Sequence, residues 1–281
     1  MGFFKFAFKY GRAYLVYYLI TMPLLNVMTY CLLRSTSSGE FFAWLPISFC
    51  VAVTAFYTFF IFRIIYKGYK VNKVLAEKGV CDEYIAMCRE AYPKMKPIQH
   101  IELAFYLYVL KRYDEAESKL ALVPIAKVKN PLVISYYCTV YAAIRINQDR
   151  WDEAQAIFTS FDSVATPYCK THDNWISIRY FLRVALLYAH NGDFESAMTC
   201  INNTDAAVSK DLKFAFSRNI TLMVVYLMQD DYENADNIKT MTLRDLEEYD
   251  GFEIKGNKEM LLVNIDDTIK HFDKRAKGIK E

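Results

Sequence analysis

The sequence predicts an all-α protein in which an N-terminal two-helix transmembrane hairpin is followed by a solenoid of antiparallel helix pairs. Two apolar runs near the N-terminus, at about residues 13–33 and 41–62, contain no charged side chain. A short motif recurs four times between residues 113 and 235: an aromatic residue, an acid and, two residues after the acid, an alanine. Self-similarity at a spacing of about 20 to 50 residues is typical of repeat proteins.

The two apolar runs predict a membrane anchor over residues 1–66. Each run exceeds the roughly 18 to 20 apolar residues that a helix needs to cross about 30 Å of hydrocarbon. A soluble helical hairpin is the alternative, but little else in the chain can bury both helices on every face. Asn26 lies within the first run and is expected to hydrogen-bond across the helix pair. We therefore expect contact with a lipid bilayer.

The positive charges predict the orientation of this anchor. Basic residues flank both runs: Lys5, Lys9, Arg12, Arg63, Lys67, Lys70 and Lys73. Positively charged flanks stay in the cytoplasm, so we expect an integral membrane protein with two spans and both termini cytoplasmic. Residues 67–78 are expected to form a basic juxtamembrane linker. The inverted topology is the alternative, and the basic flanks disfavour it.

Composition disfavours several other functions. Outside residues 1–66 the chain has 29 basic and 31 acidic residues, a net charge of −2, so we expect no nucleic acid partner. The seven cysteines are irregularly spaced, which favours reduced thiols in a cytosolic compartment. No catalytic or metal-binding motif is found, so we expect no catalytic residues, no metal and no cofactor, and an enzyme is a distant alternative.

The recurring motif predicts a helical repeat domain over residues 79–281. The four copies align on Ala116, Ala154, Ala197 and Ala235. The aromatic residue three positions earlier is Tyr113, Trp151, Phe194 and Tyr232, and the residue twelve positions earlier is Ala104, Ala142, Ala185 and Met223. Small residues on two antiparallel helices let the backbones approach closely, and an acid in the first turn suits the helix dipole. Gly192 fits the turn between the helices of the third copy.

Prolines and terminal patterns suggest the helix boundaries. Helical patterns follow Pro97, Pro131 and Pro167, where the missing N–H costs nothing. Asn130 and Thr166 are expected to cap two of these helices. Residues 79–91 are predicted to form the second helix of a preceding partial repeat. The helical spacing of apolar residues over 261–272 predicts a C-terminal capping helix.

These motifs resemble the tetratricopeptide repeat (TPR) family over residues 97–240. The intervals between the aligned alanines, 38, 43 and 38 residues, exceed the 34-residue unit of that family. The family's tyrosine nine residues before the alanine is present as Tyr188 and Tyr226 but is replaced by Leu107 and Arg145. Looser helical-repeat families such as the Sel1-like group are alternatives.

The resemblance implies a concave groove, lined by the first helix of each copy, that binds a protein or peptide. The candidate partner-binding residues are Ile101, Phe105, Tyr108, Tyr136, Thr139, Arg179, Arg183 and Leu186. Most of the positions implied by the resemblance are apolar, which suits an amphipathic helix or an extended apolar segment. Arg179 and Arg183, beside Trp175, form a basic spot or, alternatively, an ordinary solvated helix face. The chain's own first or terminal helix filling the groove is the competing arrangement.

The function that follows is a membrane-anchored scaffold or adaptor that recruits a partner protein through its cytoplasmic repeat domain. A small regulatory receptor that binds a peptide in the same groove is the alternative. Association with a second copy of the chain is left open.

Overall fold

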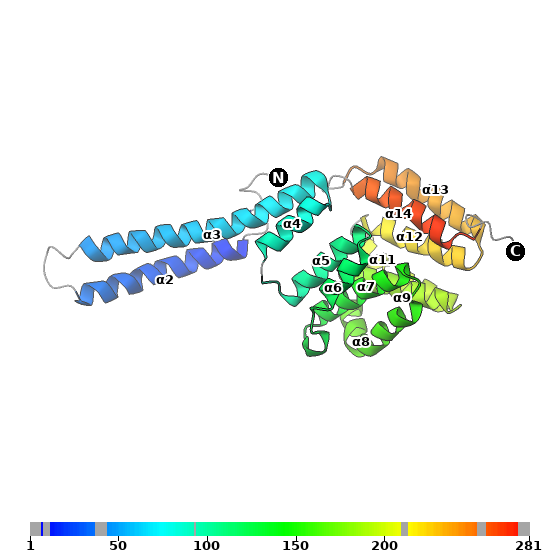
Figure 1. Ribbon diagram of the computed structural model, residues 1–281, viewed down its shortest axis with the longest axis horizontal. Helices are drawn as coiled ribbons and strands as arrows, with labels where there is room; N and C mark the ends of the chain where they lie inside the picture. Colours follow the sequence, from blue (N-terminus) through cyan, green and yellow to red (C-terminus); the bar gives the residue numbers. More distant parts are fainter. Residues whose placement is uncertain are drawn as a thin grey trace. The chain divides into compact units, whose positions relative to one another are not determined.

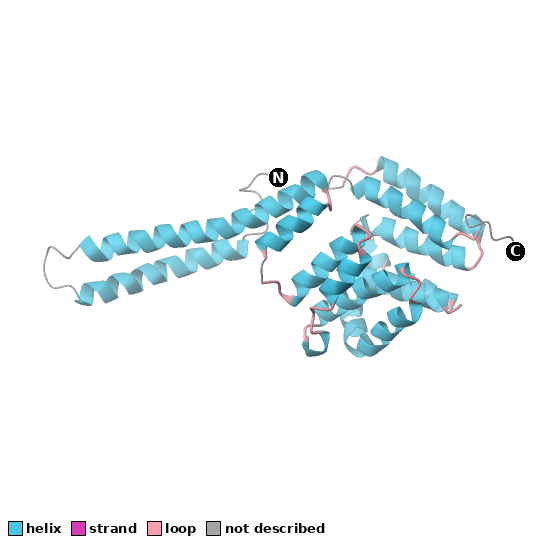
Figure 2. Ribbon diagram, in the orientation of Figure 1, coloured by secondary structure: helices cyan, strands magenta, loops and turns pink. Residues whose placement is uncertain are grey.

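The structure is a computed structural model that describes residues 7, 12–36, 44–92, 94–208, 213–251 and 257–274. Throughout these ranges the chain forms helices joined by turns and loops, with no strand, which confirms the all-α class (Figure 2). Contacts divide the chain into two compact units: residues 1–77 with 87–91, and residues 78–86 with 92–281.

The first unit contains the two apolar helices, α2 (Arg12–Thr36) and α3 (Trp44–Lys78) (Figure 1). Within the described residues, Phe49–Lys78 is long and apolar enough to cross a membrane by length and composition, with a mean hydropathy of 1.9. The apolar stretch Tyr18–Leu32 of α2 falls short of that length. The structure therefore supports one candidate span, and the two predicted spans and their orientation stay a proposal.

The segment predicted as a basic linker, residues 67–78, is helical. It forms the last part of α3, which runs for 35 residues without a break. The expected linker contains no proline, and its one glycine, Gly68, does not interrupt the helix. The charged segment is therefore a helical extension of the apolar one.

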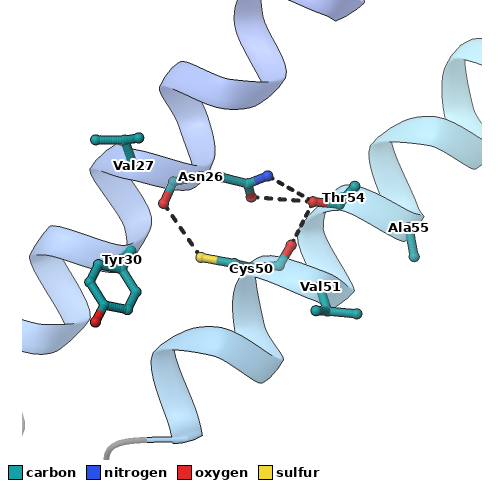
Figure 3. Close-up of a pocket in the computed structure, with 7 residues that line it drawn as sticks. All are labelled: Asn26, Val27, Tyr30, Cys50, Val51, Thr54 and Ala55. Atoms are coloured by element: carbon teal, nitrogen blue, oxygen red, sulfur yellow. Dashed lines mark hydrogen bonds between the residues drawn. The ribbon is translucent and has the colours of Figure 1, made fainter.

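Polar side chains join α2 to α3 (Figure 3). The Asn26 amide donates to Thr54 Oγ1 at 2.9 Å, and the Cys50 thiol donates to the Asn26 carbonyl oxygen at 3.4 Å. Nearer the start of α2, the hydroxyls of Tyr18 and Thr58 lie 2.7 Å apart. Later residues of α2 thus meet earlier residues of α3, so the helices are antiparallel. The predicted role of Asn26 is confirmed.

An open cavity of about 570 Å³ lies beside these hydrogen bonds on the hairpin (Figure 3). Its lining residues are Asn26, Val27, Tyr30, Cys50, Val51, Thr54 and Ala55.

The repeat region is built from paired helices (Figure 1). From residue 82 onward the elements are α4 (Asp82–Ala91), α5 (Pro97–Val109), α6 (Tyr113–Leu120), the 3₁₀ helix η2 (Ile125–Lys127), α7 (Pro131–Asn147), α8 (Trp151–Thr171), α9 (Trp175–His190), α10 (Phe194–Asn202), α11 (Asp205–Val208), α12 (Lys213–Met228), α13 (Tyr232–Glu248) and α14 (Asn257–Phe272). Contacts join α5 with α6, α7 with α8, α9 with α10, and α12 with α13. The second helix of each pair begins at the aromatic residue of the motif, so the repeat-like architecture predicted from the motif is confirmed.

The predicted small-residue contacts lie in the cores of these pairs. Ala142 and Ala154 are both fully buried and belong to one core cluster. Ala185 and Ala197 share a second cluster, and Met223 and Ala235 share a third. At 0% exposure, an alanine leaves no room for a larger side chain between the helices.

All four turns between paired helices have the same backbone geometry. The residue five positions before the aligned alanine has a positive φ in each: Lys111 (60°), Asp149 (57°), Gly192 (79°) and Asp230 (58°). In the first turn the Arg112 N–H donates to the Leu107 carbonyl and the Lys111 N–H donates to the Tyr108 carbonyl, both at 2.9 Å. The same pair of bonds recurs in the other three turns, and it is the Schellman pattern that ends a helix.

A C-terminal helix, α14, is present as predicted, and the chain from Asp267 to Lys274 reaches the turns of three copies. Its buried Ile265 belongs to the core cluster of α12 and α13. Asp267 forms an ion pair with Lys111 at 2.5 Å, and Lys274 forms one with Asp230 at 2.8 Å. The His271 ring nitrogen Nε2 lies 3.2 Å from Asp149 Oδ1. The turns of three copies, each at its residue of positive φ, thereby contact α14 or Lys274 just beyond it.

Two of the three prolines start helices as predicted, and one does not. Pro97 and Pro131 are the first residues of α5 and α7, and the Asn130 side chain accepts from the Leu132 N–H. Pro167 instead lies inside α8, and α9 is capped by Asn174. Burial of Ala165 and Cys169 stabilises this extra length of α8. The longer α8 also accounts for the 43-residue interval between the second and third copies.

Replacing Gly192 with alanine is expected to lower the free energy of unfolding by about 1 kcal/mol, because a Cβ disfavours the left-handed conformation. No atom lies within 4 Å of the added Cβ, so strain of the backbone is the sole expected cost. Gly192→Asn is the matched control and should cost less, since asparagine tolerates this conformation. Urea unfolding of the full chain in detergent measures both, and equal losses for the two variants would contradict the assignment.

Candidate partner-binding site

The eight candidate residues lie on three helices that pack side by side. Contacts join α7 to both α5 and α9. Ile101, Phe105 and Tyr108 belong to α5, Tyr136 and Thr139 to α7, and Arg179, Arg183 and Leu186 to α9. Among them Ile101, Tyr136, Thr139 and Leu186 are buried. These four are core residues and offer no open surface to a partner.

The other four candidates, together with the buried Tyr136 and with Trp175, meet in one cluster of rings and guanidinium groups. We call it the aromatic–arginine cluster, and its members are Phe105, Tyr108, Tyr136, Trp175, Arg179 and Arg183. The Arg179 guanidinium lies 4.4 Å from the centre of the Phe105 ring and 5.1 Å from that of Trp175. Tyr136 meets Trp175 edge to face at 4.8 Å. Side chains of α5 and α9 thus meet over α7, which explains why Tyr136 is buried.

Hydrogen-bond donors gather at the edge of this cluster. Arg183 Nη2 donates to the Tyr108 hydroxyl at 3.4 Å, and Asn147 Nδ2 donates to the same oxygen at 3.2 Å. Burial lowers the pKa of the Arg179 guanidinium, and the nearby charge of Arg183 acts in the same direction. Burial also raises the pKa of the Tyr136 phenol, so that group stays neutral.

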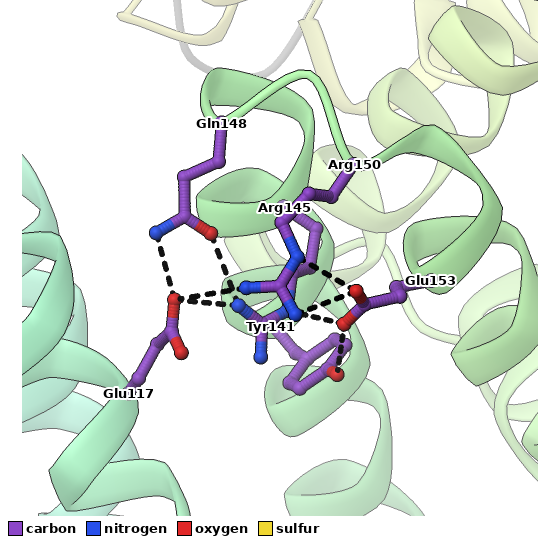
Figure 4. A network of polar contacts seen from close by, with 6 residues as sticks. All are labelled: Glu117, Tyr141, Arg145, Gln148, Arg150 and Glu153. Carbon is purple, nitrogen blue, oxygen red and sulfur yellow. Dashed lines mark hydrogen bonds and ion pairs between the residues drawn. The ribbon is translucent and has the colours of Figure 1, made fainter.

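A network of polar side chains links α6, α7 and α8 (Figure 4). Arg145 is only 8% exposed, and its guanidinium lies 2.5 Å from Glu117 and 3.1 Å from Glu153. The guanidinium also lies 4.7 Å from the centre of the Tyr141 ring, and Gln148 donates to Glu117 at 2.7 Å. One buried cation is thus held by carboxylates from the helices on either side.

In the sequence, Arg145 stands out only because it replaces the tyrosine that the TPR resemblance implies at this position. A charged residue within an otherwise apolar stretch of α7 could have indicated a buried ion pair. Its acidic partners could not be identified from the sequence, because they come from two other helices. Burial opposes ionisation of Glu117, yet hydrogen bonds from Arg145 and Gln148 hold the pKa of its carboxyl below the ordinary value of 4.5. This network joins helices and is a structural element.

The described residues contain no group of three histidine, cysteine or acidic side chains placed to hold a metal ion. Cys138 and Cys169 are buried free thiols in the core. Burial raises the pKa of the Cys138 thiol to about 12. This thiol therefore stays protonated and packs as a small apolar side chain.

Glu117→Gln is expected to lower the free energy of unfolding at neutral pH by roughly 2–3 kcal/mol. Breaking a buried ion pair costs roughly 3–5 kcal/mol, and Glu153 still pairs with Arg145 in this variant. The folded-state pKa of Glu117 lies below its unfolded value. The difference in the free energy of unfolding between wild type and variant therefore has its full size above about pH 4.5 and shrinks as the pH falls further.

Urea unfolding of the full chain in detergent, followed by tryptophan fluorescence at several pH values, tests this. Glu115→Gln on the same helix removes a partner of Arg112 whose side chain is 44% exposed, and it is the control, with a smaller change expected. A difference for Glu117→Gln that stays constant from pH 7 to acid would contradict the assignment.

Comparison of the chain with models of known protein families, with curated protein sequences and with solved structures finds no match. The resemblance to the TPR family therefore rests on the motif residues.

Proposed function

We propose that the chain is a membrane-anchored adaptor that recruits a protein partner through a TPR-like helical repeat domain. The observation that carries this proposal is the open side of the aromatic–arginine cluster. Trp175 is 36% exposed, and Phe105, Tyr108, Arg179 and Arg183 are half-buried beside it. Tryptophan, tyrosine and arginine are the side chains that most often dominate the binding energy of protein interfaces. Here they are held rigidly by three packed helices.

Membrane anchoring by two spans with cytoplasmic termini is part of the proposal. The apolar side chains on the hairpin of α2 and α3 are strongly exposed, with Phe56 at 72%. Such a surface needs an apolar environment. The polar side chains of Asn26 and Thr54 instead face each other, as expected for helices packed within lipid. Arg12 at the start of α2 and Lys67 and Lys70 near the end of α3 favour the cytoplasm for both flanks.

TPR-like organisation is proposed from the repetition within the chain. Four helix pairs share the buried small residue, the aromatic start of the second helix and the same Schellman turn. Equivalent pairs stacked in sequence would form an antiparallel solenoid. The open part of that solenoid would lie at the cluster's edge, because side chains fill its centre over α7.

Anchoring gives such an adaptor its mechanism. A partner that is also at the membrane meets the repeat surface at a raised effective concentration. Modest affinity at the cluster then suffices for recruitment. A second copy of this chain is one partner that the proposal admits.

A peptide-binding regulatory receptor is the second candidate, and the continuity of α3 favours it. The helix runs from the apolar segment through residues 67–78 without a break, so it offers a stiff connection to the membrane segment. A receptor should gain thermal stability when its peptide is added, whereas an adaptor need not.

Photocrosslinking in intact cells tests the adaptor proposal. A photoreactive phenylalanine replaces Trp175 in one variant and Met241 of α13 in the control, since these side chains are 36% and 37% exposed. We expect a reproducible foreign protein crosslinked from position 175 and absent from position 241. Crosslinks only within the chain from position 175, or the same set of proteins from both positions, would refute the proposed site.

A further inference from the structure

Lysines gather where α5 starts, α6 ends and α7 starts. Lys96 caps the start of α5, Lys119 lies in the last turn of α6, and Lys127 and Lys129 lie in or after η2, just before α7. Burial and then the charge of Lys119 lower the pKa of His100 in the first turns of α5, so the end of α6 lies close to the start of α5.

The start of α7 lies at the same end. Near the end of α5, the Tyr108 hydroxyl accepts a hydrogen bond from Asn147, the last residue of α7. Helices α5 and α7 are in contact and therefore run parallel, with their starts together. The loop from Ala121 to Asn130 joins the end of α6 to the start of α7, so its lysines belong to this end as well.

The positive charge at this end is not compensated by the chain. Residues 92–101 and 118–148 contain no aspartate or glutamate, although the chain outside residues 1–66 has a net charge of −2. In the part of the repeat region that the structure describes, the four lysines have no carboxylate within ion-pair distance. At the opposite end of the helices, by contrast, Lys111 pairs with Asp267 and Lys274 with Asp230.

Two apolar side chains are exposed among these lysines. Leu122 is 56% exposed in the turn after α6, and Ile98 is 36% exposed in the first turn of α5. The turn of Leu122 is held in place, because the adjacent Val123 is buried and its N–H donates to the Leu120 carbonyl at 2.9 Å. We call this surface the basic end, and its members are Lys96, Ile98, Lys119, Leu122, Lys127 and Lys129.

We infer that the basic end binds the anionic headgroups of the bilayer that holds the hairpin. Lysines near a bilayer are attracted to anionic lipids, and neighbouring apolar side chains can enter the boundary between headgroups and acyl chains. The exposed Leu122 and Ile98 therefore favour a lipid surface over a soluble anion.

The inference rests on the proposed membrane anchoring and adds a second contact, which orients the repeat region. Only α4 lies between α3 and α5 along the chain, so a short tether keeps the lysines at a high effective concentration near the headgroups. The remainder of the repeat region is net acidic and is repelled by the same headgroups, which favours one orientation.

The test uses the full chain in lipid nanodiscs, with a fluorescent amino acid in place of the exposed Ala126 in η2. The discs contain phosphatidylcholine alone or phosphatidylcholine with phosphatidylglycerol, and both include a lipid with a nitroxide quencher on its headgroup. We expect strong quenching in the anionic discs and little in the neutral ones. The same fluorophore in place of Met241 of α13 is the control and should show no difference between the discs.

Two double variants separate the basic end from overall charge. Each lysine near an anionic bilayer contributes about fivefold to binding, so Lys127→Gln with Lys129→Gln should lower the ratio of docked to undocked chain by about tenfold to thirtyfold. Lys239→Gln with Lys270→Gln removes the same charge from α13 and α14 and should leave the quenching unchanged. Leu122→Ser should also reduce quenching, which an interaction through charge alone would not show.

Equal quenching in neutral and anionic discs, or equal loss in the two double variants, would overturn the inference. Absence of quenching in the anionic discs would also overturn it and would leave an acidic protein surface as the occupant. Co-elution of the chain with the discs reports on the anchor separately. A chain that co-elutes with the anionic discs alone and is quenched there would refute the anchor and support the basic end. Co-elution with both discs without quenching from position 126 would leave the anchor standing and refute the basic end.

Discussion

The close approach of paired helices at buried alanines is the constraint on which the repeat region depends. In the second copy Ala142 and Ala154 are fully buried in one core cluster, and in the third copy Ala185 and Ala197 take their place. Backbones this close leave no space for a longer side chain. The turn between the two helices of a pair must suit this close packing. In all four copies it has one residue of positive φ at the same position and the same pair of backbone hydrogen bonds.

This packing determines what the candidate site can be. Since α5 and α9 both contact α7, their side chains meet over it, and the centre of the expected groove is filled by the chain itself. The surface that is left carries aromatic rings and the guanidinium groups of Arg179 and Arg183. Rigid aromatic side chains lose little entropy on binding, so a small edge of this kind suits the proposed recruitment of a partner.

The sequence predicted features that depend on local chemistry or on the repeat. The helix pairs, the buried alanines, the cap at Asn130 and the glycine turn at Gly192 are of this type. Pro167 was misinterpreted because tertiary burial of Ala165 and Cys169 extends α8 past a residue that usually starts a helix. Non-glycine residues hold the other three left-handed turns, and no local pattern distinguishes them. Contacts between side chains of separate helices could not be predicted, because they form only when the helices pack. The Arg145 network and the ion pair of Asp267 in α14 with Lys111 are examples.

Replacing Ala142 with arginine tests the central claim, the packing register of the helix pairs, most directly. Ala156→Arg is the matched control, because this alanine is exposed on α8. Thermal and urea unfolding of the full chain in detergent, followed by helical circular dichroism, should show a loss of about 3–5 kcal/mol or failure to fold for Ala142→Arg, the cost of a buried unpaired charge. The change for Ala156→Arg should stay within about 0.5 kcal/mol. Equal stability of the two variants would contradict the account.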